Sequence, residues 1–243
     1  MIESQNLEYC KKCGKVLSGD YCSHCGFPKK IKRIDKQYIF YEIGSVLNFD
    51  KGIFYTIKEL LIRPGKTVQE FILEDRNRIV KPIVFIIVCS LVYSIFQQIF
   101  NFEDGYVGYS FEKESAITSI FDWVSKNYGY SNILMGIFIA FWIKIFFKKY
   151  SYNFYEILIL LCFVMGIGML LFACFGIVDS LIDLKIIDKG YLIGILYILW
   201  AIVQFFDKKK FINYPKAIFS YFLGMITFMI SIYLIGGLID YLK

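Results

Sequence analysis

The sequence is poor in the residues that most enzymes and ion-coupled transporters use. It has one histidine in 243 residues, and charged residues make up only 20% of the chain. It has no glycine-rich phosphate loop, and no nucleophile, base and open metal position occur in the pattern of a catalytic centre. The long apolar segments also lack the series of Asp, Glu or His residues that a proton relay uses. These absences argue against an enzyme and against a proton-coupled pump.

The shortage of charge also excludes an ordinary soluble domain. Hydrophobic residues form 57% of the chain, and the 18 glycines add about 7%, whereas globular proteins contain roughly 45–50% of these residue types together. A soluble protein of this length could not remove so much apolar surface from water. The composition therefore predicts an integral membrane protein.

Five apolar segments predict five transmembrane helices, because each is close to the length that crosses the hydrocarbon core. We expect residues 82–243 to form an all-α integral membrane bundle. The predicted spans are Pro82 to Phe102, Ser131 to Phe147, Ile157 to Val178, Gly190 to Phe206 and Ala217 to Leu238.

The charges between the spans predict an orientation. Lys and Arg gather before the first span, after the second and between the fourth and fifth, whereas the other connections are acidic. Positive charge marks the cytoplasmic side, so we expect the N-terminus inside and the C-terminus outside. Met1 to Tyr9 is polar and acidic, so no signal peptide is expected there.

Residues 31–81 are too interrupted by charge to cross a membrane. Apolar residues recur at helical spacing on both sides of Pro64-Gly65, which predicts interfacial amphipathic helices on the cytoplasmic side. Thr67 and Glu70 have the spacing of a capping box that would begin the second helix. The expected apolar faces are Ile53, Phe54, Ile57, Leu60 and Leu61 in the first helix and Val68, Phe71 and Ile72 in the second.

Lys144 is the only basic residue inside a predicted span. It lies one helical turn from Lys148, so we expect its ammonium group to reach the cytoplasmic surface along the helix. Glu156, at the start of the next span, could pair with it. The functional alternative is that Lys144 serves as a counter-ion or substrate ligand.

Residues 1–30 are predicted to be a zinc ribbon, because two C-x-x-C-G pairs supply four sulfur ligands. Each pair presents two thiolates from one tight turn, and four thiolates complete a tetrahedral zinc site. The site then has no open position for water, so one structural zinc ion per chain is expected. The predicted ligands are Cys10, Cys13, Cys22 and Cys25.

The cysteines have other uses in proteins. A disulfide framework is the structural alternative, but the predicted topology places the four cysteines in a reducing compartment. His24 is expected to be exposed and not to be a ligand. Cys89, Cys162 and Cys174 lie inside predicted spans, where cysteine acts as a small apolar residue.

The sequence resembles an uncharacterised bacterial membrane family that is known as a domain of unknown function. The resemblance runs from the ribbon to the first predicted span, and Thr56 to Gly65 carries the T-x-x-x-L-x-x-R-P-G motif. Glu74-Asp75 stands where the family has Gly-Lys. The resemblance implies a bacterial inner membrane location. The five-span plan is also similar to Yip-type membrane proteins, which are linked with membrane trafficking and interaction.

Three arginines, Arg63, Arg76 and Arg78, carry much of this resemblance outside the ribbon. Their simplest role is to hold positive charge on the cytoplasmic side. The sharper hypothesis is that they bind lipid phosphates, because Pro64-Gly65 reverses the chain and can bring the three guanidinium groups together at headgroup depth.

Together these features predict a membrane-embedded interaction or scaffold protein with a cytoplasmic zinc ribbon. The expected partners are membrane lipids or a cytoplasmic protein, with nucleic acid less favoured, and a homo-oligomer is compatible with the sequence. Two alternatives remain open. One is a small-molecule or ion transporter with a cavity beside Lys144 and Glu156, and the other is a lipid-modifying enzyme with its site at the cytoplasmic interface.

Overall fold

The computed structural model describes residues 9–10, 13–16, 19–26, 52–100, 102, 115–182 and 186–242. The chain divides into two compact units, 1–44 and 45–243, which we call unit 1 and unit 2. In unit 1, Tyr9 and Val16 form an antiparallel bridge. The predicted boundary at residue 30 and the start of the predicted interfacial segment lie outside the described residues.

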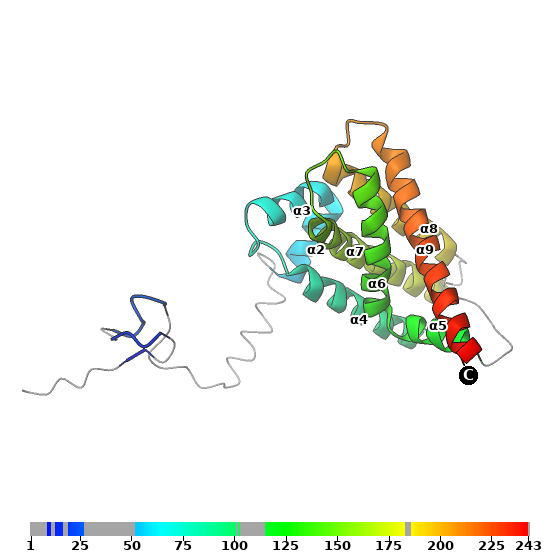
Figure 1. The fold of residues 1–243 in the computed structure, drawn as a ribbon, viewed down its shortest axis with the longest axis horizontal. Helices are drawn as coiled ribbons and strands as arrows, with labels where there is room; N and C mark the ends of the chain where they lie inside the picture. Colours follow the sequence, from blue (N-terminus) through cyan, green and yellow to red (C-terminus); the bar gives the residue numbers. More distant parts are fainter. Residues whose placement is uncertain are drawn as a thin grey trace, which may run out of the picture. The chain divides into compact units, whose positions relative to one another are not determined.

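The described part of unit 2 is helical (Figure 1). Short connections join most of the successive helices. The helices are α2 (Ile53–Ile62), α3 (Pro64–Leu73), α4 (Pro82–Phe100), α5 (Ala116–Lys126), α6 (Tyr128–Phe146), α7 (Phe154–Ile182), α8 (Ile187–Phe206) and α9 (Asn213–Leu242).

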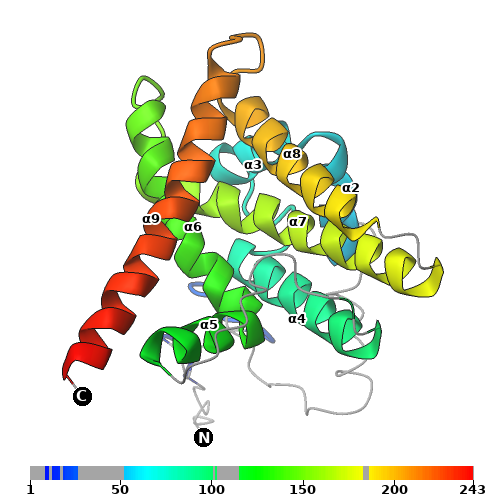
Figure 2. The same ribbon diagram turned by 90° about the vertical axis from the view of Figure 1, so that its right-hand side faces the viewer.

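Helix α7 is the centre of unit 2 (Figure 2). Helices α2, α3, α4, α6 and α8 all pack against it, and α9 packs on α6 and α8. In the most apolar segment of α7, 72% of the residues are buried. In the corresponding segments of α4 and α9, 28% and 22% of the residues are buried. A helix that is apolar on every side belongs in the interior of a large or membrane-embedded bundle. The outer faces of α4 and α9 instead carry exposed Ile, Leu and Phe side chains.

Four described helices, α4, α7, α8 and α9, are long and apolar enough to cross a membrane. Helices α5 and α6 add a fifth candidate only if they count as one broken span, because they meet at an angle of 102°. The prediction of an all-helical membrane bundle is therefore confirmed with four to five candidate spans.

Helices α2 and α3 form a hairpin that packs on α7 and α8. Arg63 is the single residue between them, and Pro64 occupies the first position of α3, where its missing N–H costs nothing. The predicted capping box is therefore wrong, since α3 begins three residues before Thr67. The Thr67 hydroxyl instead donates to the carbonyl oxygen of Glu59 at 3.3 Å.

The hairpin buries most of the face that the sequence indicated. All three predicted residues of α3 are buried, whereas Phe54 and Leu61 of α2 are exposed by 48% and 43%. The sequence predicted the apolar face of α2 but not its partners, because helical spacing alone does not fix how wide a face the neighbouring helices cover. The interfacial position of α2 and α3 stays a prediction. The three buried residues of α3 are Val68, Phe71 and Ile72.

Thr56 and Leu60, which belong to the T-x-x-x-L-x-x-R-P-G motif, hold the hairpin in position. Thr56 is fully buried, and its hydroxyl donates to the carbonyl of Gly52 at 3.0 Å and accepts from the N–H of Val80 at 3.1 Å. Leu60 is also fully buried, and its carbonyl oxygen accepts a hydrogen bond from the Tyr197 hydroxyl at 3.0 Å. These bonds tie α2 to the segment before α4 and to α8.

Gly65 lets α3 approach the backbone of α8. A Cβ atom at this position would lie 2.3 Å from the carbonyl carbon of Gln204, which cannot move aside as a flexible side chain could. Nearby, the Gln69 side-chain amide donates to the carbonyl oxygen of Phe205 at 2.7 Å, at the C-terminal end of α8. The Pro-Gly pair therefore begins α3 and permits its contact with α8.

We expect Gly65→Ala to lower the free energy of unfolding of unit 2 by about 3 kcal/mol, because the added methyl group forces two backbones apart. Gly237→Ala is the matched control, since a Cβ atom there meets nothing within 4 Å. Thermal unfolding in detergent measures both variants. Equal melting temperatures would contradict the proposed close approach of α3 and α8.

Candidate functional site

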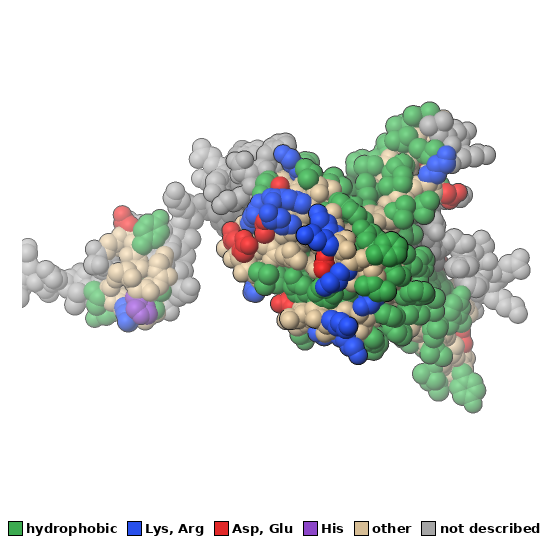
Figure 3. Space-filling view, turned by 90° about the horizontal axis from the view of Figure 1, so that it is seen from above, with side chains coloured by type: hydrophobic (Ala, Val, Ile, Leu, Met, Phe, Trp, Pro, Cys, Tyr) green, Lys and Arg blue, Asp and Glu red, His purple; other side chains and the backbone are tan. Residues whose placement is uncertain are grey.

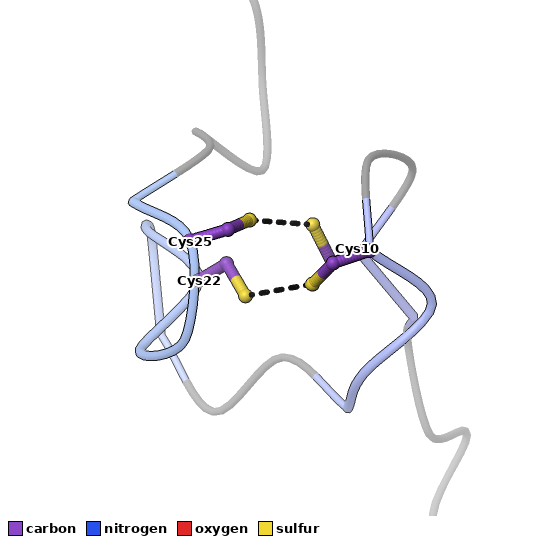
Figure 4. Close-up of side chains that lie close together, drawn as sticks. Cys10, Cys22 and Cys25 are labelled. Atoms are coloured by element: carbon purple, nitrogen blue, oxygen red, sulfur yellow. Dashed lines mark hydrogen bonds between the residues drawn. The ribbon is translucent and has the colours of Figure 1, made fainter.

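The four cysteines of unit 1 come together in one cluster. Their Sγ atoms all lie within 4.8 Å of one another. The Sγ atoms of Cys10 and Cys25 are 3.6 Å apart, as are those of Cys13 and Cys22. Figure 4 shows the labelled sulfurs pointing toward one another across the two turns. The cluster could hold a metal ion. No disulfide bond joins these four cysteines, so the structure does not show the disulfide alternative.

Each C-x-x-C turn closes at the glycine that follows it. Gly14 and Gly26 have φ values of 70° and 68°, in the left-handed region that glycine adopts without a steric cost. Their N–H groups donate to the carbonyl oxygens of Cys10 and Cys22 at 2.9 and 2.8 Å. The glycines therefore allow each turn to present two sulfurs to the same point.

The local backbone also favours the charged form of one sulfur. Hydrogen bonds from the N–H groups of Cys25 and His24 lower the pKa of the Cys22 thiol to about 6. A thiol with this pKa is largely a thiolate at pH 7, which is the form that binds metal ions. The His24 side chain is exposed, as the sequence predicted.

Unit 2 contains a separate cluster of charged side chains on the α2–α3 hairpin. The carboxylates of Glu59 and Glu70 are 12% exposed and lie between the guanidinium groups of Arg63 and Arg78. Arg63 Nε donates to Glu59 Oε2 at 2.9 Å, and Lys66 Nζ lies 3.7 Å from Glu70 Oε1. Arg78 Nη1 donates to Glu70 Oε2. We call these residues the arginine–glutamate cluster.

Tyr55 completes the arginine–glutamate cluster from the other side of Arg78. Its hydroxyl oxygen accepts hydrogen bonds from Nε and Nη2 of Arg78, both at 3.2 Å. This hydroxyl, followed by the charges of Glu70 and Glu59, raises the pKa of Arg78 against the opposing effect of its desolvation. The guanidinium group is therefore held in its charged form where it joins α2, α3 and the segment before α4.

The structure thus brings together two of the three arginines that the sequence singled out. Arg63 and Arg78 share the two glutamates, whereas Arg76 is exposed and lies outside the arginine–glutamate cluster. The sequence pattern did not indicate Glu59, Glu70 and Tyr55 as partners of these arginines. Only the four-residue spacings of Glu59 with Arg63 and of Lys66 with Glu70 could have indicated pairs, because the other partners are seven or more residues apart.

Lys144 contacts backbone and not a carboxylate. Its Nζ donates to the carbonyl oxygen of Tyr152 at 2.6 Å, in the connection between α6 and α7. Glu156 instead accepts from the N–H of Asn153 at 2.7 Å, and Asn153 Oδ1 accepts from the N–H of Glu156 at 2.9 Å, which caps α7. The ammonium group thus reaches the end of its helix, and the suggested pair of Lys144 with Glu156 is replaced by these contacts.

Lys and Arg side chains gather on one face of unit 2 (Figure 3). This face is the end of the bundle at which the α6–α7 and α8–α9 connections lie (Figures 1 and 2). The connections contribute exposed lysines, and the α2–α3 hairpin contributes Lys66. The exposed lysines of the connections are Lys148, Lys149, Lys208, Lys209 and Lys210.

We expect Arg78→Lys to lower the free energy of unfolding by about 1–2 kcal/mol, because lysine keeps the charge but cannot donate to Tyr55 and both glutamates at once. Arg76→Lys is the control, and its effect should stay within about 0.5 kcal/mol. Thermal unfolding in detergent at low salt compares the two variants. A loss that is no larger for Arg78 than for Arg76 would contradict a structural role for the arginine–glutamate cluster.

Residues 50–94 match the model of a family described as Protein of unknown function (DUF3667). No curated protein and no solved structure matches the chain. The matched residues include the hairpin, the arginine–glutamate cluster and most of α4, whereas the four-cysteine cluster lies outside them. The similarity to Yip-type proteins stays a prediction. The chain is thus similar, over the α2–α3 hairpin and α4, to a family whose function is unknown.

Proposed function

We propose that this chain is a membrane-anchored interaction or scaffold protein whose unit 1 is a structural zinc ribbon. The observation that carries the proposal is the cluster of four sulfurs in unit 1. A tetrahedral zinc ion with Zn–S bonds of about 2.3 Å separates its sulfur ligands by about 3.8 Å. The two 3.6 Å sulfur separations agree with that geometry.

The role in binding follows from the chemistry of such a site. Four thiolates leave zinc no open position for water or substrate, so the metal stabilises the fold of a small module and does not activate a reactant. A ribbon stabilised in this way presents its surface to another molecule. We propose a cytoplasmic protein or the anionic lipid surface as that partner, since basic residues flank the ribbon.

The zinc proposal predicts one zinc ion per chain. Cys22→Ser removes a ligand, so the metal content should fall at least tenfold, and residues 9–26 should become sensitive to protease while unit 2 keeps its melting temperature. Cys174→Ser is the matched control, because Cys174 is exposed and lies on α7. Elemental analysis of freshly purified protein measures the metal. Iron in place of zinc, or equal metal in both variants, would contradict the proposal.

We also propose a bacterial inner membrane location with the N-terminus in the cytoplasm. The lysine-rich connections on one end of the bundle support this orientation, because positive loops are retained on the cytoplasmic side. Anionic headgroups are then the natural contacts of that end, with Arg76 more accessible than Arg63 and Arg78, whose guanidinium groups already bind Glu59 and Glu70.

The orientation predicts opposite behaviour of two fusions. A reporter that is active only outside the cytoplasm should be active after Lys243, and a reporter that is active only inside should be active before Met1. Reversing the charge of the connection at Lys208, Lys209 and Lys210 should reduce the outside signal. Equal location of the two ends would mean that the chain crosses the membrane an even number of times, with α5 and α6 outside the hydrocarbon core.

The transporter alternative, which the sequence suggested at a cavity beside Lys144 and Glu156, has weaker support than the scaffold proposal. Lys144 donates to the Tyr152 carbonyl oxygen, and Glu156 accepts from the N–H of Asn153. Neither residue lines the cavity that unit 2 contains among its helices.

A further inference from the structure

Unit 2 contains a cavity of about 50 Å³ among its helices. The lining residues come mainly from the middle turns of α4, α7, α8 and α9 and from the first half of α6. Four of these helices are candidate membrane spans, and the cavity lies near the middle of their length.

Methionine is concentrated at this cavity. The chain has six methionines, and every one except Met1 lines it. Among the described residues, the large apolar side chains that are exposed on the outer faces are Ile, Leu, Val, Phe, Tyr and Trp, without a methionine. Five methionines from three helices therefore line one space. They are Met135 of α6, Met165 and Met169 of α7, and Met225 and Met229 of α9.

The side chains that line the cavity favour a soft, weakly charged ligand. Among the described lining residues there is no Asp, Glu, His, Lys or Arg, so hard cations and anions find no charged partner. Thioethers are soft, neutral ligands that favour Cu(I) and similar ions. Aromatic side chains, including Phe172 and Phe228, also line the space, and their ring faces can offset part of the cost of a buried positive charge.

The size of the cavity agrees with an ion. A cavity needs roughly 10–15 Å³ to hold one water molecule, so this space has room for an ion or a few small molecules but not for a lipid chain. One sulfur is already oriented, because the side-chain amide of Asn132 donates to Met169 Sδ at 2.8 Å. A thioether sulfur has two lone pairs, so this bond leaves one for a metal ion.

We propose that the methionine cavity binds one soft monovalent cation, which is Cu(I) in the cell and for which Ag(I) is the experimental probe. The site is independent of the four-cysteine cluster, because it lies in unit 2 and uses thioethers and not thiolates. Methionines that served only as adaptable packing would not retain the ion.

The test uses the full-length chain without thiolate ligands. The ribbon cysteines and Cys174 are changed to Ser, and the buried Cys89 and Cys162 are changed to Ala. Native mass spectrometry with Ag(I) should then show one ion per chain. Met165→Leu combined with Met229→Leu conserves side-chain volume, and it should weaken Ag(I) binding at least tenfold. Ile226→Leu with Ile230→Leu is the matched control on exposed positions of α9 and should not change binding.

A second measurement covers the case in which the cysteine-free chain fails to fold. The chain with all its cysteines should take up one more Ag(I) ion than its Met165→Leu, Met229→Leu variant after the thiolates are saturated. The absence of Ag(I) from the folded cysteine-free chain, or equal Ag(I) binding by the double leucine variant, would overturn the proposal. Neither result would bear on the zinc proposal, which is tested separately by the metal content of the chain with its cysteines.

Discussion

Close packing around α7 is the interaction on which the arrangement of unit 2 depends. In lipid, helices gain little from the hydrophobic effect when they associate, so small residues must let them approach. Gly166 of α7 fits against the ring of Phe85 from α4, and Gly194 of α8 fits against Phe172 of α7, where a Cβ atom would come within 2.8 and 2.2 Å of the rings. The central helix can thus be buried by neighbours on several sides, and those neighbours expose their outer faces to lipid.

The α2–α3 hairpin depends on this bundle for its position. Gly65 seats α3 on the backbone of α8, and Tyr197 of α8 bonds the backbone of Leu60. In this position of the hairpin, Arg63 and Arg78 form ion pairs with the same two glutamates, Glu59 and Glu70. The motif residues therefore have a structural explanation within the segment that matches a family of unknown function, and the explanation does not require a catalytic role.

The protein places sulfur in two chemically different environments. In unit 1, four cysteines form a small cluster in which backbone N–H groups lower the pKa of the Cys22 thiol, which suits a divalent ion. In unit 2, five methionines line a cavity without charged groups, which suits a soft monovalent ion. Thiolates neutralise the charge of a bound ion, whereas thioethers do not, so the ion proposed for the methionine cavity is the one with the lower charge.

The sequence alone determined the features that depend on local spacing. The apolar runs predicted the helices that became α4, α6, α7, α8 and α9, and the paired cysteines predicted their own cluster, because each turn needs only its neighbouring residues. Tertiary structure alone decided the partners of Arg78, the acceptor of Lys144, the start of α3 before Thr67 and the convergence of the methionines. These features join residues from different helices, and the pattern of one helix does not record which face its neighbours will cover.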